Sequence, residues 1–426
     1  MNLNEAFLEF INSISLEDDK KINEHIKSVI KKLNKSYYDL DSDYDNMLVV
    51  GSLGRKTYVT LSSDVDLLFI LPNDLYEKYD NRKNNGQSGL LSDVRKVLLE
   101  RFSRTEIGAD GQVVDIQFDD CLVELVPCFA EEDGSFTYAD TNGGGSWKNT
   151  KPRLEINECE EFSKSYIQFR DICKIIRGWK HENGVKINGL LIDTFVYNYL
   201  KDNEELMNKE DINFDFYQEF YNIINYMSNQ SEDQQYWHAL GSNQKIYNRK
   251  NYNYIKKSSK TIKELDMCDE ESSRWSMIRT LLGSKFPAAP YEKECSDNEE
   301  FITDRYELYL KYDIKIDALV TQDGWRPFFL REMLNGMLST KRLKFRKKLK
   351  FTIIDSNIPG NYTVFWKVRN LGDESIRKNC IRGKIYQSIE RIENTAFNGP
   401  HYVECFAVQG NICVARARLS VPIDDC

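Results

Sequence analysis

Residues 47 to 129 contain four short apolar runs, and this spacing constrains the fold more than any other feature of the 426-residue chain. The runs are MLVV, DVDLLFILP, GQVVDIQF and LVELVPCF. Turn residues separate them, and the amphipathic stretch SDVRKVLLERF stands between the second and the third. Short strands combined with helical sequence predict a sheet with helices packed on it.

The rest of the chain changes pattern twice. Residues 1 to 36 carry apolar positions at helical spacing and predict two helices that lead into the first core. The middle of the chain is mainly helical, and from about residue 308 the pattern alternates as strands do. We therefore expect an α+β protein with three parts: a core with N-terminal helices at 1–155, a helical lobe at 156–295 and a β-rich domain at 305–426.

Composition excludes several classes of protein. The net charge of -9 argues against a generally basic protein that wraps a nucleic-acid duplex, although it permits nucleotides in a local pocket. No apolar run approaches the roughly 20 residues that cross a bilayer, and the N-terminus lacks a secretion signal. The ten cysteines are scattered, and none of the four histidines has the spacing of a zinc site. We expect a cytoplasmic protein without a structural metal.

The run DVDLLFILP carries two carboxylates, Asp64 and Asp66, two residues apart. Side chains at this spacing on a strand face the same side, so the two carboxylates project together while Val65, Leu67 and Phe69 point into the core. Magnesium binds through a few carboxylates together with substrate phosphates, and two ions suit phosphoryl-type transfer. The pair therefore predicts a site for two Mg²⁺ or Mn²⁺ ions.

A Gly-Ser turn precedes this strand and supplies groups that bind phosphate. Gly51 lets backbone N–H groups approach a triphosphate, and the hydroxyl of Ser52 donates to it. Arg55 adds positive charge nearby. A two-metal site also needs a third carboxylate from a neighbouring strand, and spacing alone does not decide between Asp115 and Glu124.

The helical sequence after residue 165 has an apolar stripe, and Lys174, Arg177 and His181 fall on the opposite, polar face. That face is a candidate to meet a triphosphate, although isolated basic residues on a helix are more often solvated. Asp193 lies in an apolar helix, where a hydrogen-bonded structural role is the default.

The order Gly-Ser, then Asp-x-Asp, then an acid three residues before a proline resembles the polymerase-β-like nucleotidyltransferase superfamily. This resemblance places Glu124, which is followed by Pro127, at the third acidic position, and keeps Asp115 in reserve. The stretches CKIIRGWK and KINGLLIDTFVYNYL resemble the helical domain of oligoadenylate synthetases and cyclic GMP-AMP synthases. By that resemblance Lys174 and Arg177 contact phosphates, and Asn188 lines the nucleotide pocket.

Further stretches resemble bacterial SMODS enzymes, which are cyclic GMP-AMP synthase-like nucleotidyltransferases (CD-NTases). These stretches are DTNGGGSWKNTKPRLEI, WHALGSNQ and LLGSKFP, and the C-terminal FWKVRNLGDE, ENTAFNGPHYVEC and ICVARARLSV resemble the sensor domain fused to some of these enzymes. The resemblance implies a synthase that joins ribonucleoside triphosphates into a cyclic di- or oligonucleotide in anti-phage signalling. A separate effector protein would read the product, and the C-terminal domain would bind a regulatory ligand.

Two other functions stay open from the sequence. A nucleotidyltransferase of the same chemistry modifies an RNA end, a small molecule or a protein, whereas a nucleotide sensor performs no catalysis. The three acids Asp64, Asp66 and Glu124 argue against a sensor, and the acidic balance disfavours an obligatory long nucleic acid.

Overall fold

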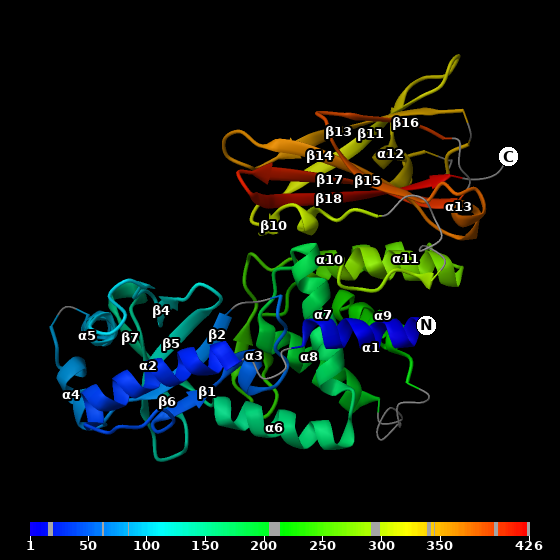
Figure 1. The fold of residues 1–426 in the computed structure, drawn as a ribbon. Helices are drawn as coiled ribbons and strands as arrows, with labels where there is room; N and C mark the ends of the chain where they lie inside the picture. Colours follow the sequence, from blue (N-terminus) through cyan, green and yellow to red (C-terminus); the bar gives the residue numbers. More distant parts are fainter. Residues whose placement is uncertain are drawn as a thin grey trace.

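The computed structural model describes residues 1–15, 20–61, 64–83, 85–203, 214–290, 299–338, 342–344, 346–395 and 399–423. A sheet with its own helices, a group of helices and a pair of packed sheets follow one another along the chain (Figure 1). The α+β class that we predicted from the sequence is confirmed. No helix within the described residues is long and apolar enough to cross a membrane.

A seven-stranded mixed sheet forms the core of the first part. Its strands are β1 (Met47–Val49), β2 (Asp64–Ile70), β3 (Glu106–Ile107), β4 (Val114–Gln117), β5 (Leu122–Ala130), β6 (Phe136–Asp140) and β7 (Ser146–Thr150). The order is β1-β2-β5-β4-β3, with β6 paired to β5 and β7 paired to β6. Because β2 and β5 run parallel at the centre, the chain must cross over between them, and α4 (Asp74–Asp80) and α5 (Gly86–Leu99) lie in that crossover.

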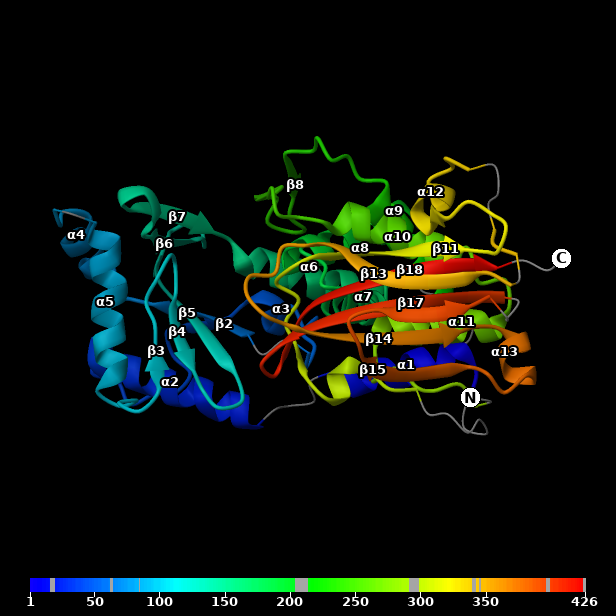
Figure 2. The same cartoon turned by 90° about the horizontal axis from the view of Figure 1, so that it is seen from above.

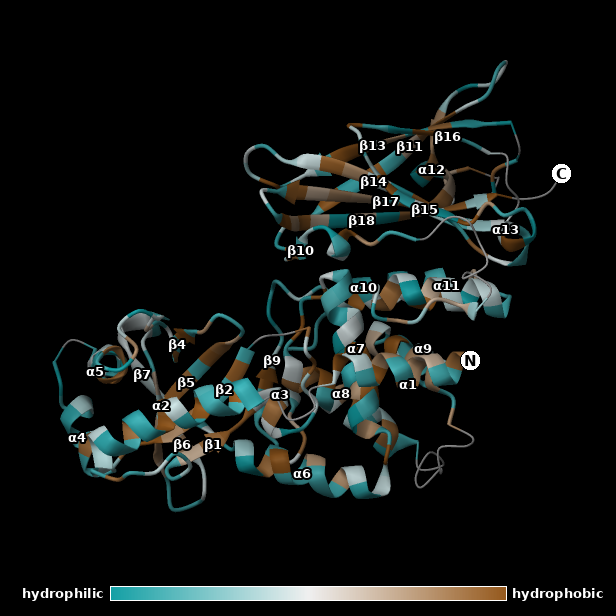
Figure 3. Ribbon diagram, viewed as in Figure 1, coloured by the Kyte–Doolittle hydropathy of each residue, from teal (hydrophilic) through white to brown (hydrophobic). Residues whose placement is uncertain are grey.

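Strand alternation gives the two faces of this sheet different roles. Val65, Leu67 and Phe69 of β2 are fully buried in one cluster with apolar side chains of α5 and of α2 (Lys20–Tyr38). Figure 3 shows the core strands mainly in hydrophobic colours and the outward surface of α2 in hydrophilic ones. Since side chains alternate along a strand, the remaining residues of β2 face away from α2 and α5.

Helices make up the second part, the helical lobe. They are α1 (Leu3–Ile14), α6 (Pro152–Ser165), α7 (Phe169–Asn183), α8 (Gly189–Asp202), α9 (Phe216–Ser228), α10 (Tyr254–Leu265) and α11 (Glu271–Leu282), with the hairpin of β8 (Tyr236–His238) and β9 (Lys245–Tyr247). Here the structure departs from our expectation, because only α2 joins the first core. The phenyl rings of Phe7 and Phe10 on α1 are fully buried in the lobe cluster, and Gly178 of α7 leaves room for Phe10.

The C-terminal part consists of two packed sheets. One has the order β10-β18-β17-β14-β15 and the other β12-β11-β13-β16. The strands are β10 (Glu307–Leu308), β11 (Ile314–Thr321), β12 (Phe328–Phe329), β13 (Lys348–Ser356), β14 (Thr363–Asn370), β15 (Arg382–Gln387), β16 (Arg391–Asn394), β17 (Gly399–Gln409) and β18 (Ile412–Ile423), with short helices α12 (Leu330–Leu334) and α13 (Asp373–Arg377). Apolar side chains of both sheets, such as Phe351 and Trp366, form the core between them.

The outer face of the five-stranded sheet is charged, yet it is buried against the helical lobe. Arg416 of β18 bonds to Glu182 of α7 at 2.5 Å, and Arg418 bonds to Glu264 of α10 at 2.7 Å. Glu404 of β17 accepts a second bond from Arg416 at 2.5 Å. Seen from above, this sheet pair lies over the lobe and leaves the core sheet uncovered (Figure 2). The C-terminal part is therefore docked on the lobe through ion pairs.

Candidate active site

Carboxylates from three neighbouring strands form one row on the face of the core sheet opposite α2. Asp66 of β2 pairs in register with Glu124 of β5, and Glu124 pairs in turn with Asp115 of β4. Asp64 stands two residues before Asp66 and therefore on the same face. Strand pairing thus brings together both predicted metal ligands and both candidates for the third acid, with Glu124 between Asp66 and Asp115.

The electrostatics of the row favour a bound cation. Burial raises the pKa of Asp66, Arg55 opposes the rise, and Asp64 adds to it. Burial, Asp66 and Asp64 together raise the pKa of Glu124 to about 7. Like charges so close disfavour the ionised state of each other, and a divalent cation removes that repulsion.

Glu124 is the better placed of the two candidate third acids. It lines the same cleft as Asp64 and Asp66, whereas Asp115 is outside the lining of that cleft. Burial raises the pKa of Asp115, and within the described part of the chain its buried Oδ1 has no hydrogen-bond partner. The oxygen-only donor set of Asp64, Asp66 and Glu124 fits a hard cation such as Mg²⁺ or Mn²⁺.

The Gly-Ser turn lies directly against this row. Gly51 opens the short helix α3 (Gly51–Gly54) with φ +61°, a conformation that favours glycine. A Cβ at Gly51 would lie 1.7 Å from Oδ2 of Asp66. Ser52 follows and lines the cleft. The turn can approach the carboxylates this closely only because residue 51 has no side chain.

Arg55 and Arg177 both lie in the cleft wall, but an acid already occupies their guanidinium groups. Asp193 is fully buried and accepts from Nε of Arg55 at 2.8 Å and from two nitrogens of Arg177 at 2.5 and 2.9 Å. Thr57 donates to the same carboxylate at 3.1 Å. Burial works against the charge of Asp193, and the two arginines more than offset this and lower its pKa. Because Arg55 follows α3 and Arg177 lies on α7, this cluster joins the core to the lobe.

Two other predicted nucleotide contacts have different placements. Lys174 is outside the lining of the cleft, and its Nζ lies 3.3 Å from Asp171 on the same helix. Asn188 does line the cleft, and its side chain also caps α8 by accepting from the N–H of Leu190 at 2.7 Å.

Lys180 is a cleft residue that we did not single out from the sequence. It lies one helical turn beyond Arg177, and both Lys180 and His181 line the cleft. Burial lowers the pKa of Lys180, and Asp64 is among the groups that oppose this. The signal was present in the sequence, since Lys180 extends the polar face that contains Arg177.

The cleft has a volume of about 1000 Å³ and walls from all three parts of the chain. The core contributes the carboxylates and the Gly-Ser turn, the lobe contributes α7 and residues 184–190, and the C-terminal part contributes Leu308, Tyr309 and Leu310. This volume is at the upper end of the range of small-molecule sites, roughly 300–1,000 Å³. The cleft is therefore large enough for more than one small ligand.

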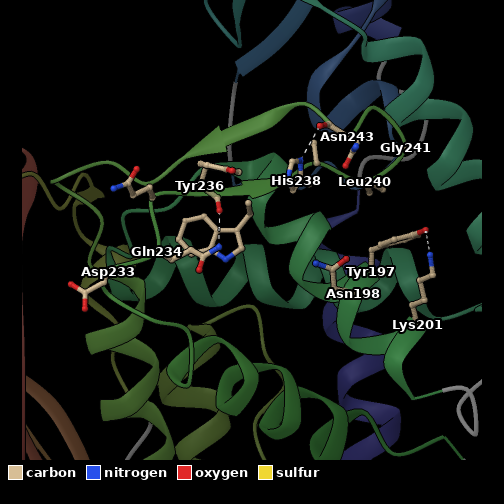
Figure 4. Close-up of a pocket in the computed structure, with 13 residues that line it drawn as sticks. Tyr197, Asn198, Lys201, Asp233, Gln234, Tyr236, His238, Leu240, Gly241 and Asn243 are labelled. Atoms are coloured by element: carbon tan, nitrogen blue, oxygen red, sulfur yellow. Dashed lines mark hydrogen bonds between the residues drawn. The ribbon is translucent and has the colours of Figure 1, made fainter.

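A second pocket lies on the lobe between α8 and the β8–β9 hairpin (Figure 4). Its polar groups largely bind one another. Tyr197 donates to Glu158 at 2.7 Å and lies 3.3 Å from Nζ of Lys201, while Nδ1 of His238 lies 3.1 Å from the carbonyl oxygen of Asn243. These groups are already paired, and among the described residues that line this pocket Asp233 is the one acid, so the pocket lacks the carboxylate row of the cleft.

One further group of potential metal ligands lies elsewhere on the core. Ligand atoms of His25, Asp120 and Cys121 lie within 4.8 Å of one another. Nε2 of His25 is 2.9 Å from Asp120, and its ring stacks on Phe118 at 3.9 Å. The group is explained by a hydrogen bond and a ring stack, so the carboxylate row is the stronger candidate for a catalytic metal.

Residues 1–162 match the sequence model of the Second Messenger Oligonucleotide or Dinucleotide Synthetase (SMODS) domain, and residues 296–424 match that of the Adenylyl/Guanylyl and SMODS C-terminal sensor domain. The chain therefore carries a SMODS domain followed by a SMODS C-terminal sensor domain. It is a nucleotidyltransferase, and Asp64, Asp66 and Glu124 lie within the SMODS match. The cleft thus has its carboxylates in the SMODS domain and three of its lining residues, Leu308, Tyr309 and Leu310, in the sensor domain.

Relatives of known description agree with this assignment. The chain is 20% identical over 235 residues to a probable cyclic nucleotide synthase of Bacillus cereus (strain VD146), and the alignment covers 46% of this chain and 71% of the relative. The chain is 28% identical over 149 residues to a cyclic GMP-AMP synthase of Staphylococcus schleiferi, and this alignment covers 31% of this chain and 44% of the relative.

Solved structures of related nucleotidyltransferases also align with the chain. The CD-NTase CdnG of Bradyrhizobium diazoefficiens in complex with GTP covers 65% of this chain and 94% of its own, at 8% identity and a TM-score of 0.48. The CdnC:HORMA-deltaN complex of E. coli MS115-1 covers 67% and 98%, at 15% identity and a TM-score of 0.46.

Proposed function

We propose that this SMODS enzyme joins ribonucleoside triphosphates into a cyclic di- or oligonucleotide second messenger. The observation that carries the proposal is the row of Asp64, Asp66 and Glu124 beside the Gly-Ser turn, in a cleft of about 1000 Å³. Acids in such a row bind cations, and the cleft volume suits two nucleotides better than one. The names of the curated relatives, a cyclic nucleotide synthase and a cyclic GMP-AMP synthase, support the same chemistry.

In the proposed reaction the hydroxyl of one bound nucleotide attacks the α-phosphorus of the second. A new P–O bond forms, the bond between the α-phosphorus and pyrophosphate breaks, and the hydroxyl gives up its proton to water. Asp64, Asp66 and Glu124 would hold two Mg²⁺ or Mn²⁺ ions, which when bound supply positive charge to the attacking and leaving oxygens. A second round of attack within the same cleft would close the ring.

The remaining cleft residues would orient the triphosphate. Gly51, Ser52 and Lys180 line the cleft together with the carboxylates, so the Ser52 hydroxyl and the N–H groups of the turn would donate to phosphate. Lys180 would add a positive charge, since among the described residues no acid forms a salt bridge with it. Arg55 and Arg177 would act indirectly, because Asp193 already holds their guanidinium groups. They would hold the core and the lobe in the relative position that the reaction requires.

The match to the SMODS domain also supports the expected biology of an anti-phage signalling enzyme in the cytoplasm. The product would be read by a separate effector protein, and the sensor domain would bind a regulatory ligand. These partners remain part of the proposal.

The test is to incubate the protein with the four ribonucleoside triphosphates and Mg²⁺ or Mn²⁺, and to identify the products by mass. We expect cyclic products and pyrophosphate from the wild type and neither from Asp64→Ala or Asp66→Ala. Product that forms only on added RNA would instead indicate modification of an RNA end. No pyrophosphate release with either metal, with or without an extract of phage-infected cells, would refute the synthase.

A matched pair of variants identifies the third acid. We expect Glu124→Ala to abolish turnover and Asp115→Ala to retain a substantial part of it, because only Glu124 lines the cleft. Asp119→Ala is the control, since this acid is exposed on the same hairpin. If Asp115→Ala abolishes turnover and Glu124→Ala does not, the assignment of the third acid is wrong.

A further inference from the structure

Part of the wall of the cleft belongs to the sensor domain. Leu308, Tyr309 and Leu310 line the same cleft as Asp64 and Asp66, although they lie within the match to the C-terminal domain. The cleft of this chain is therefore a composite of both domains. These three residues of the sensor domain lie where substrate would bind.

This wall is held firmly in place from two sides. β10 pairs in parallel with β18, and the N–H of Tyr309 donates to the carbonyl oxygen of Cys413 at 3.0 Å. On the other side Leu310 packs against the lobe, where a Cβ at Gly184 would lie 2.8 Å from two carbon atoms of Leu310. The backbone of this segment is thus fixed between β18 and the loop that follows α7.

The side chain of Tyr309 is unusually open for a ring in a fixed segment. It is 65% exposed, and within the described residues its side chain makes no hydrogen bond and no ring contact. The lining of the cleft also contains the apolar residues Val185, Ile187 and Leu310. Carboxylates, Ser52 and Lys180 belong to the same lining. The cleft therefore offers charged groups for a triphosphate as well as apolar side chains and an exposed aromatic ring.

We propose that Tyr309 is a specificity-determining residue on which the base of a bound nucleotide stacks, so that the sensor domain contributes directly to substrate binding. This inference rests on the proposed nucleotidyltransferase function. A base has two apolar faces and needs such a surface, whereas phosphates do not, and stacking on an aromatic ring contributes substantially to the binding of each base. The wall of the sensor domain thus participates in choosing the nucleotide.

The experiment measures binding apart from turnover. Wild type, Tyr309→Ala and Tyr309→Phe are titrated calorimetrically with α,β-methylene analogues of the four ribonucleoside triphosphates and with inorganic tripolyphosphate, all with Mg²⁺. We expect Tyr309→Ala to weaken binding of at least one nucleotide by about 5- to 150-fold and to leave tripolyphosphate unchanged. Tyr309→Phe keeps the ring, so its affinity should stay within about twofold of the wild type. In turnover the Tyr309→Ala change should appear in KM more than in kcat.

Tyr44→Ala is the matched control, because this tyrosine is 68% exposed on the core and lies outside the cleft lining. It should bind every nucleotide as the wild type does, and thermal melts should confirm that all variants are folded. Equal binding of all four nucleotides by Tyr309→Ala and wild type would overturn the proposal, as would an equal loss for tripolyphosphate. If the wild type binds nucleotides in this Tyr309-dependent way but releases no pyrophosphate, the proposed synthase fails while the stacking role stands.

Discussion

The contact between Gly51 and Asp66 gives a sharp test of how the active site is built. In Gly51→Ala the new Cβ would lie 1.7 Å from Oδ2 and 2.5 Å from Cγ of Asp66, whereas Cβ atoms essentially never come closer than 3.0 Å to a neighbour. The carboxylate must therefore move by more than 1 Å. A displacement of about 1 Å in a reacting assembly costs about 100-fold in rate. We expect kcat to fall by about that factor or more.

The same substitution also strains the backbone, and this effect must be separated from the displacement of Asp66. Alanine at φ +61° costs about 1–2 kcal/mol of stability. Gly134→Ala supplies the control, because Gly134 has φ +79° in the β5–β6 turn and nothing within 4 Å of its Cβ position. It should lose a similar amount of stability and keep wild-type turnover.

The assay is pyrophosphate release under saturating triphosphate, with a denaturant titration of each variant. Binding of Mn²⁺, followed by its paramagnetic effect on water protons, reports separately on the carboxylates. If Gly51→Ala keeps kcat within about threefold of wild type, then a displacement of Asp66 is tolerated and the position of this carboxylate does not limit the reaction.

Three further perturbations test other parts of the chain. Asp193→Asn removes the negative charge between Arg55 and Arg177. Because breaking a buried ion pair costs about 3–5 kcal/mol, the midpoint of denaturant unfolding should fall clearly. An unchanged midpoint would contradict the view that this cluster joins the core to the lobe. Lys180→Met should raise KM for triphosphates about tenfold or more, because a hydrogen bond to a charged group is lost, while Lys174→Met should leave KM unchanged. Burial lowers the pKa of His401 to about 4. An unfolded histidine titrates near 6.5, so the free energy of unfolding of the C-terminal domain should have its full value above that pH. It should fall by up to about 3 kcal/mol as the pH drops toward 4, and His401→Asn should lose this pH dependence.

Strand periodicity was sufficient to predict the shared face of Asp64 and Asp66, because the direction of a side chain on a strand follows from its position in the sequence. It could not rank Asp115 against Glu124. Both face the same side of the sheet, and only strand order decides which one stands beside Asp66. Strand order depends on pairing between distant segments, and a local pattern contains no information about it.

Helical periodicity had a similar limit on α7. It placed Lys174 and Arg177 on one polar face, but the face of a helix does not reveal what lies opposite each turn. In the structure Lys174 lies outside the cleft lining, and Arg177 binds Asp193 of the next helix. A lone acid in the apolar sequence of α8 was a usable signal, since a buried carboxylate needs a cationic partner and Arg177 is a nearby candidate.

In the C-terminal domain, the alternation of polar and apolar residues along a strand is not sufficient to predict which side chains are exposed to solvent. The alternating pattern of β18 predicts that Arg416 and Arg418 face solvent, yet both are buried against the lobe with acid partners. Such pairs add little net stability compared with apolar packing, but they are satisfied in one docking geometry only, since a shift would leave charges buried without partners. That geometry matters for the cleft, because β18 holds α7 through Arg416 and Glu182 and also pairs with β10, which leads into Tyr309. One strand of the sensor domain therefore sets the distance between two walls of the nucleotide cleft.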